Sequence, residues 1–109
     1  MYKRVLLKLS GEALSGNGST FNAEVLKSLA DELKEVQSKG VQVAIVVGGG
    51  NFIRGKMAVE LGMDRTQGDH MGMLATIINA LAIQSTLEAE GIDTRVQTSL
   101  NMPDVAEPF

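Results

Sequence analysis

Three consecutive glycines end an apolar run, at a point where exposed main-chain N–H groups could bind a phosphate. Gly48, Gly49 and Gly50 directly follow VQVAIVV. Glycine has no side chain to keep an anion away from these N–H groups. It can also adopt the left-handed conformations that form an anion-binding nest. Because three glycines exceed what a tight turn needs, we favour a phosphate-binding loop over a simple turn.

Two cations accompany the glycines along the chain. Arg54 follows the last of them and could hold a phosphate through two parallel hydrogen bonds. Lys8 lies in an apolar segment, just before a Gly/Ser-rich stretch, and could stabilise a phosphoryl group during transfer. The alternative for both residues is an ordinary position on the surface.

The same stretch invites comparison with the Walker A loop, G-x-x-x-x-G-K-[ST]. Gly50, Gly55 and Lys56 match its spacing, but Met57 stands where a Ser or Thr hydroxyl should bind Mg²⁺. The glycines also crowd the end of the apolar run instead of opening a wide loop. We therefore favour a different phosphate site.

An acidic residue supplies a further candidate. The stretch GDHMGM, residues 68–73, is expected to open a long helix, with Asp69 at its N-terminus. A carboxylate there could simply cap the helix. Alternatively, it could accept hydrogen bonds from two ribose hydroxyls, as acidic residues do in nucleotide sites.

Two strands and a helix must position the first of these groups. Residues 3–9 and 41–47 are short apolar runs, and the second is so continuous that it predicts a strand covered on both faces. Between them, apolar residues recur at helical spacing from 23 to about 39, with Asn22 as the cap and Gly40 as the stop. This is a strand–helix–strand unit with a right-handed crossover.

A second long helix is predicted from about Asp69 to Glu90, ended by Gly91. Residues 94–98 then suggest a third strand, and no element is expected in the last ten residues. The apolar stripe predicted for the second helix consists of Met73, Leu74, Ile77, Ile78, Leu81 and Leu87.

This alternation predicts the start of a doubly wound α/β sheet, in which ligands bind at the carboxyl ends of the strands. Three strands and two helices leave a sheet edge and apolar helix faces without partners. We therefore expect residues 1–109 to be part of a longer protein.

Composition narrows the classes of function. The chain has 109 residues, a net charge of −3 and no cysteine, and it has one histidine. The acidic balance argues against a nucleic-acid or membrane-surface binder, and the residue counts exclude thiolate and His-cluster metal sites. No apolar run reaches the length of a membrane span, and Lys8 and Glu12 interrupt what could be a signal peptide. A cytoplasmic location is expected.

Several motifs together resemble the amino acid kinase superfamily, and within it the bacterial UMP kinases. The motifs are KLSGE (8–12), VVGGGNFIRG (46–55), GMDR (62–65), GDHMGMLAT (68–76) and DTRVQT (93–98). The resemblance implies the parallel-sheet αβα sandwich of the carbamate kinase-like type, here incomplete. Residues 1–109 would be the N-terminal part of a single domain, which binds the nucleoside monophosphate and phosphates. The C-terminal ATP-binding half would lie beyond them.

The resemblance also implies ATP-dependent phosphorylation of UMP to UDP, with Mg²⁺ accompanying ATP. Lys8 and Arg54 would be catalytic, and Gly49 and Asp69 would bind UMP. The ATP-binding residues would be Lys8, Ser10, Gly11, Gly50 and Arg54. In-line phosphoryl transfer needs positioned cations more than a nucleophile, so such a site suits the reaction.

The bacterial UMP kinases are typically homohexamers that GTP activates and UTP inhibits. Gln84, Ser85 and Glu88 depart from the charged residues that the family often has at its effector site. Two other interpretations stay open. One is another enzyme of the superfamily, acting on a carboxylate or carbamate. The other is a non-catalytic nucleotide-binding or assembly module.

Overall fold

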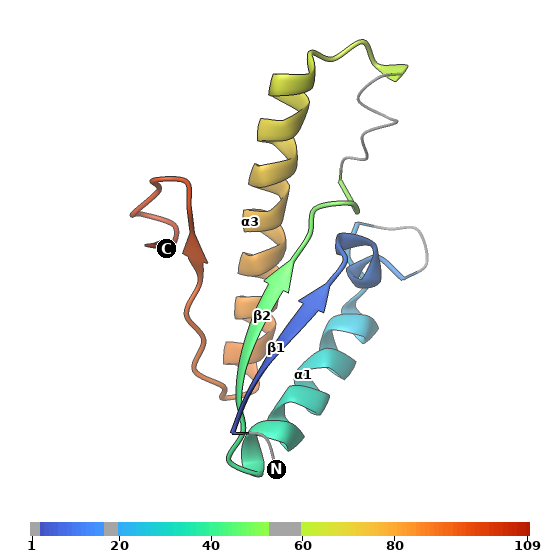
Figure 1. Cartoon of the computed structure of the whole chain (residues 1–109). Helices are drawn as coiled ribbons and strands as arrows, with labels where there is room; N and C mark the ends of the chain where they lie inside the picture. The colour runs from blue at the N-terminus through green and yellow to red at the C-terminus, as the bar shows by residue number, and fades with distance from the viewer. Residues whose placement is uncertain (1–2, 17–19, 53–59) are drawn as a thin grey trace.

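A computed structural model of the chain describes residues 3–16, 20–52 and 60–109 (Figure 1). Arg54 lies outside the described residues, and so do Gly55, Lys56 and Met57, which were compared with the Walker A loop. Within the described part, the chain is an α/β structure with parallel strands, which confirms the predicted fold class.

Two parallel strands form the main sheet. β1 (Arg4–Leu9) and β2 (Gln42–Val47) pair in register, with Lys8 opposite Val46. Residues alternate between partly buried and exposed along both strands, because successive side chains point to opposite faces. The apolar run of β2 led us to expect cover on both faces. Among the described residues, however, one face is open: Leu6 is 61% exposed and Val46 is 54% exposed.

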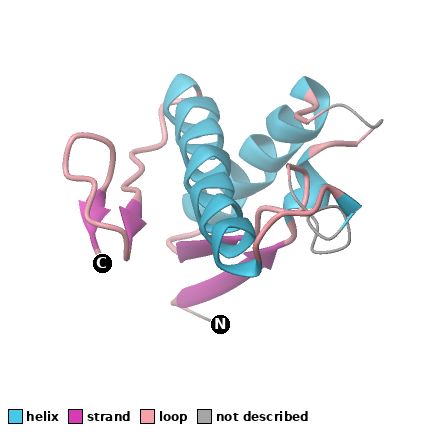
Figure 2. Cartoon of the chain, turned by 90° about the horizontal axis from the view of Figure 1, so that it is seen from above, coloured by secondary structure: helices cyan, strands magenta, loops and turns pink. Residues whose placement is uncertain are grey.

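Both long helices lie on the same face of this sheet (Figure 2). The buried core joins Leu14 to residues of the two helices: Ala30 and Leu33 from one, Ile83 and Leu87 from the other. The inward side chains of the strands pack on this core, namely Leu9, Val43, Ile45 and Val47. The doubly wound pattern of helices on both faces is therefore not seen in the described part of this chain.

The first helix, α1 (Ala23–Ser38), begins and ends as the sequence predicts. The Asn22 side-chain oxygen accepts hydrogen bonds from the N–H groups of Glu24 and Val25, at 2.9 and 3.2 Å. This capping satisfies two N–H groups that have no partner within the helix. Gly40 follows the helix with a φ of 81°, a left-handed conformation that other residues rarely adopt.

The second helix, α3 (Arg65–Ala89), begins four residues before the predicted start at Asp69. Its N-cap is Asp64, whose carbonyl accepts a hydrogen bond from the N–H of Gly68 at 2.9 Å. Asp69 consequently lies in the second turn, so the prediction that it opens or caps the helix is wrong. Two glycines within α3 disfavour a helix locally, which is why the sequence pattern starts it too late.

The predicted apolar stripe of α3 is only partly correct. Ile77 and Leu87 are buried as expected, whereas Met73, Leu74 and Ile78 are 39–45% exposed. The buried residues of α3 are Gly68, Ala75, Ile77, Asn79, Ile83 and Leu87. The buried side of α3 is thus narrow, and it includes the small residues Gly68 and Ala75 and the polar residue Asn79.

The C-terminal part of the described chain forms a separate two-stranded parallel sheet (Figure 2). It consists of β3 (Gln97–Thr98) and β4 (Glu107–Pro108). The strand predicted over 94–98 is reduced to residues 97–98, and the Thr94 carbonyl accepts a 3.4 Å hydrogen bond from Gln84 of α3. β4 forms where no element was expected.

The open face of the sheet and the exposed side of α3 predict self-association of the 109-residue chain. Large apolar side chains in water favour burial against another molecule, and unpaired strand edges invite pairing. We expect light scattering after size exclusion to show a mass that rises with protein concentration. Replacing Leu6 and Val46 by threonine should weaken the effect, since threonine keeps the strand propensity and removes apolar surface. A monomer whose melting temperature does not depend on concentration would contradict this expectation.

Candidate functional site

The carboxyl ends of β1 and β2 lie side by side, and both lead into glycine-containing segments (Figure 1). After β1, Ser10 caps the short 3₁₀ helix η1 (Gly11–Leu14). After β2, the segment 48–51 follows, which we call the glycine loop. The N–H of Gly48 donates a 2.9 Å hydrogen bond to the Leu9 carbonyl, so the strand pairing continues into the loop.

The glycine loop and the start of η1 touch through their backbones. A side-chain carbon built on Gly11 would lie 2.5 Å from the Gly50 nitrogen and 2.6 Å from the Asn51 side-chain oxygen. One built on Gly50 would lie 2.1 Å from an oxygen of the Glu12 carboxylate. The contacts of Gly11 include backbone atoms, so close approach requires a glycine there, whereas at Gly50 the Glu12 side chain could move aside.

The glycine loop also packs closely against α3. A carbon built on Gly49 would lie 2.9 Å from both the Gly72 carbonyl oxygen and the Ala75 methyl group. The expected left-handed nest is wrong, because none of the three glycines of the loop is among those with positive φ. The lack of side chains instead lets the loop pack closely between η1 and α3.

The main-chain N–H groups of Gly49 and Gly50 are candidate hydrogen-bond donors to a ligand. Within residues 3–16, 20–52 and 60–109, no hydrogen bond uses either of them. The loop is a tight turn in which the N–H of Phe52 donates to the Gly49 carbonyl at 3.0 Å. Free N–H groups at the carboxyl edge of a parallel sheet can donate to phosphate oxygens.

Lys8 and Ser10 lie at the same edge. Lys8 is exposed and lies on the open face of the sheet, one residue before the end of β1. It is therefore not a buried cation in the described chain, and its flexible side chain can extend beyond the strand end. The hydroxyl oxygen of Ser10 accepts a 3.3 Å hydrogen bond from the N–H of Ala13, which ties it to the turn.

Asp69 lies in α3 one turn before Gly72, whose carbonyl oxygen is close to the glycine loop. Residues three and seven positions apart share a helix face, so Asp69, Gly72 and Thr76 are aligned. Gly72 and Thr76 are both near the position of a carbon built on Gly49, at 2.9 and 3.3 Å. Asp69 is exposed, one turn farther toward the start of α3. Asp69 thus shares a helix side with Gly72 and Thr76, although its predicted helix position is wrong.

Two asparagines of this site were missed by the sequence analysis. Asn51 ends the glycine loop, and Asn79 is fully buried in α3. Their side-chain amides exchange two hydrogen bonds, of 2.9 and 2.7 Å. A signal for Asn79 was present: it is a polar residue inside the apolar run IINALAI, where a buried side chain must find partners.

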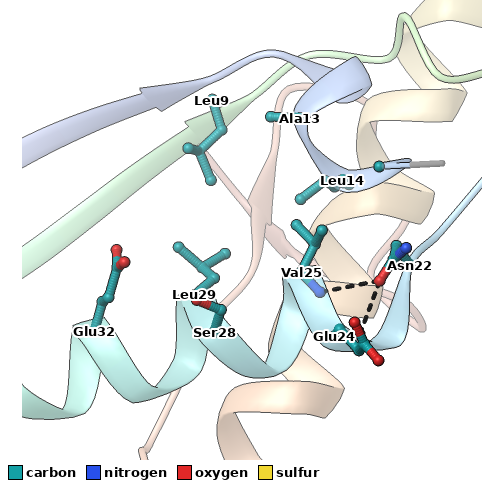
Figure 3. A pocket seen from close by; sticks show the side chains of 10 residues that line it. Leu9, Ala13, Leu14, Asn22, Glu24, Val25, Ser28, Leu29 and Glu32 are labelled. Atoms are coloured by element: carbon teal, nitrogen blue, oxygen red, sulfur yellow. Dashed lines mark hydrogen bonds between the residues drawn. The ribbon is translucent and has the colours of Figure 1, made fainter.

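A cavity of about 450 Å³ lies apart from the glycine loop, between η1 and α1 (Figure 3). Its walls include Leu9, Leu14 and Leu29, with the carboxylates of Glu24 and Glu32 also lining it. Among the described residues, none of the predicted site residues lines it, and neither does any lysine or arginine. Without a cation or a predicted site residue among its described walls, this hollow is not the phosphate site that the sequence predicts.

The resolved electrostatic effects lie away from the candidate site. Lys27 of α1 forms ion pairs with Asp31 and with Glu90 at the end of α3, and its hydrogen bond to Glu90 raises its pKa. The hydrogen-bonded ion pair between Arg95 and Glu107 lowers the pKa of Glu107 and raises that of Arg95. These exposed pairs join elements of the fold.

In the described part of the chain, no helix is long and apolar enough to cross a membrane.

The chain was compared with known proteins. A family model described as the amino acid kinase family matches residues 3–104. Among curated proteins, the chain is 62% identical to a uridylate kinase of Limosilactobacillus reuteri and 55% identical to one of Pediococcus pentosaceus. Each alignment covers 99% of this chain and 45% of the relative. The chain therefore spans less than half the length of these relatives.

Two solved structures that are similar to this chain are both of UMP kinases. The UMP kinase of Bacillus anthracis superposes with a TM-score of 0.92 at 44% identity, covering 99% of this chain and 45% of that one. The UMP kinase of Ureaplasma parvum gives a TM-score of 0.91 at 36% identity, covering 100% of this chain and 48% of that one.

Proposed function

The chain belongs to the amino acid kinase family, and we propose that the protein containing it transfers the γ-phosphoryl group of ATP to UMP, forming UDP. The observation that carries the proposal is the juxtaposition of the glycine loop with η1 and α3, in a chain 62% identical to a uridylate kinase. Such a loop can hold a phosphate next to a second nucleotide. We also propose that residues 1–109 form the part of the domain that binds UMP and phosphates.

The glycine loop would orient the two phosphate groups. The N–H groups of Gly49 and Gly50 are proposed to donate to phosphate oxygens of UMP and ATP, respectively. Gly11 would bring the β1 side of the site close to them, and Ser10 would complete the turn around the ATP phosphates. Backbone donors are already fixed before the reaction, so they stabilise charge without reorganising.

Lys8 and Arg54 would neutralise the charge that moves during transfer. Phosphoryl transfer spreads negative charge over the equatorial oxygens, and a cation placed there lowers the barrier. The exposed side chain of Lys8 at the end of β1 supports this role. The role of Arg54 is proposed from the family resemblance alone.

Asp69 is proposed to hold the ribose of UMP. Its exposed carboxylate, on the helix face that meets Gly49, can accept hydrogen bonds from two neighbouring hydroxyls. Along the helix axis, Asp69 lies about 5 Å before Gly72 and about 10 Å before Thr76, a range that a phosphate and its ribose can span.

Mg²⁺ is proposed to accompany ATP as the counter-ion of its phosphates. Among the described residues, no group of three or more His, Cys, Asp or Glu side chains could hold a metal ion. We assign no ligand for Mg²⁺ to this part of the chain, and the roles above rest on the chain's own residues.

Assembly and regulation complete the proposal. The exposed apolar residues Met71, Met73 and Leu74 on α3 support a homo-oligomer, for which we propose the hexamer typical of the bacterial UMP kinases. GTP and UTP as effectors rest on the same resemblance. A cytoplasmic location follows from the proposed substrates.

The test is an assay of the protein at the full length of its relatives. We expect UDP to form from ATP and UMP with Mg²⁺, and no product from glutamate or carbamate. Lys8→Ala serves as the inactive control. Phosphorylation of a carboxylate or carbamate instead of UMP would favour another enzyme of the family. Binding of both nucleotides without turnover would favour a non-catalytic module. The 109-residue chain alone should be inactive, because it covers only 45% of the relatives.

A further inference from the structure

The glycine loop is held at both ends by a pair of side-chain amides. Asn79 Nδ2 donates to the Gly48 carbonyl at 2.7 Å and to the Asn51 side-chain oxygen at 2.7 Å. Asn51 Nδ2 donates in turn to the Asn79 side-chain oxygen and to the Thr20 carbonyl, both at 2.9 Å. Four hydrogen bonds therefore join α3, the glycine loop and the segment before α1.

We propose that Asn51 and Asn79 are positioning residues, which fix the orientation of the Gly49 and Gly50 N–H groups for phosphate binding. This inference rests on the proposed function, because that function makes these N–H groups part of the site. Gly48 is fixed through both of its backbone groups, the N–H by Leu9 and the carbonyl by Asn79. Asn51 is fixed through its side chain, so the two peptides between them have little freedom.

The burial of Asn79 explains why an amide stands there. The residue is 0% exposed, and every buried side-chain nitrogen and oxygen of the described residues has a hydrogen-bond partner. An apolar residue at 79 would pack in α3 but would leave the Gly48 carbonyl and the Asn51 amide without partners. Only a side chain with both a hydrogen-bond donor and an acceptor can pair with the Gly48 carbonyl and the Asn51 amide at once.

The amide pair acts as one unit, and this predicts a particular pattern among variants. Removing either side chain breaks both mutual hydrogen bonds. Asn51→Ala and Asn79→Ala should each lower kcat/KM for both substrates by about tenfold, since a small displacement of the loop misplaces both phosphates. The double variant should lose little more than the worse single variant.

Asn22→Ala is the matched control. Asn22 is also an asparagine whose side chain accepts two hydrogen bonds, but from backbone N–H groups at the start of α1. Its loss should lower the melting temperature without changing the kinetics. A second measurement follows hydrogen exchange of the peptide covering residues 46–52. Exchange there should accelerate in the three loop variants and stay unchanged in Asn22→Ala.

The outcomes separate this inference from the proposed function. If the parent protein makes no UDP, the proposed function fails, and the exchange of residues 46–52 still decides whether the amide pair holds the loop. Unchanged exchange in Asn51→Ala overturns the inference, whatever the activity. So does a double variant whose kinetic losses multiply, or an equal kinetic loss in Asn22→Ala. If Asn79→Ala does not fold, Asn51→Ala carries the test, because Asn51 is in the loop and only partly buried.

Discussion

Replacing Lys8 by alanine in the full-length protein is expected to lower kcat by about a hundredfold or more, with a smaller change in KM for ATP. The ammonium group at the end of β1 would meet negative charge that develops only during phosphoryl transfer. Ground-state binding of ATP would have other donors, including those proposed in the backbone at Gly11 and Gly50. An interaction made mainly in the transition state appears in kcat.

Asp69→Asn should show the opposite pattern, a raised KM for UMP with a nearly unchanged kcat. The ribose hydroxyls do not change charge during the reaction, so their hydrogen bonds are equally strong in the ground state and the transition state. Steady-state kinetics with both substrates varied will separate the two variants. A lost kcat in Asp69→Asn together with a change only of KM in Lys8→Ala would reverse the assigned roles.

Lys3→Ala provides a charge-matched control for Lys8. Lys3 stands just before the other end of β1, five residues from Lys8. At about 3.3 Å per residue it is about 16 Å away, beyond the Debye length of about 8 Å at physiological salt. Removing its charge should therefore leave kcat unchanged. A comparable loss in Lys3→Ala would mean that net charge, and not position, explains the effect of Lys8.

Elements with strong local signals were predictable from the sequence. The helix after Asn22 starts at its cap and stops before Gly40, because capping and a left-handed glycine depend on neighbouring residues only. The two parallel strands were recognisable as short apolar runs. The edge at which Lys8 and the glycines meet then follows from the parallel connection, which brings the carboxyl ends of both strands together.

Features that depend on contacts between distant segments were not predictable. The start of α3 was missed because Gly68 disfavours a helix locally, and its burial in the fold outweighs that preference. Asn79 was missed because its partners, Gly48 and Asn51, are about thirty residues away in the chain. The left-handed conformation expected of the three glycines was wrong, since the loop uses glycine for close approach and not for positive φ.

That reason leads to the second large effect, for Gly11→Ala. The added carbon would lie 2.5 Å from the Gly50 nitrogen and 2.9 Å from the Gly49 carbonyl carbon, both of them backbone atoms. Backbone cannot rotate away as a flexible side chain can, so η1 and the glycine loop must separate. We expect a loss of stability of about 1–3 kcal/mol from overpacking. Displacement of the loop should in addition lower kcat/KM by about a hundredfold.

Gly72→Ala tests whether contact, and not the mere loss of a glycine, causes this effect. Gly72 lies in α3 beside the same loop, but a carbon built on it would meet no atom within 4 Å. In a helix interior, alanine is more favourable than glycine by about 0.5–1 kcal/mol, so the melting temperature of Gly72→Ala should stay equal or rise. Thermal unfolding of both variants, followed by kinetics on Gly11→Ala, makes the comparison. A Gly11→Ala protein as stable and active as the parent would show that η1 and the glycine loop are not in backbone contact, and the geometry proposed for the phosphate site would be wrong.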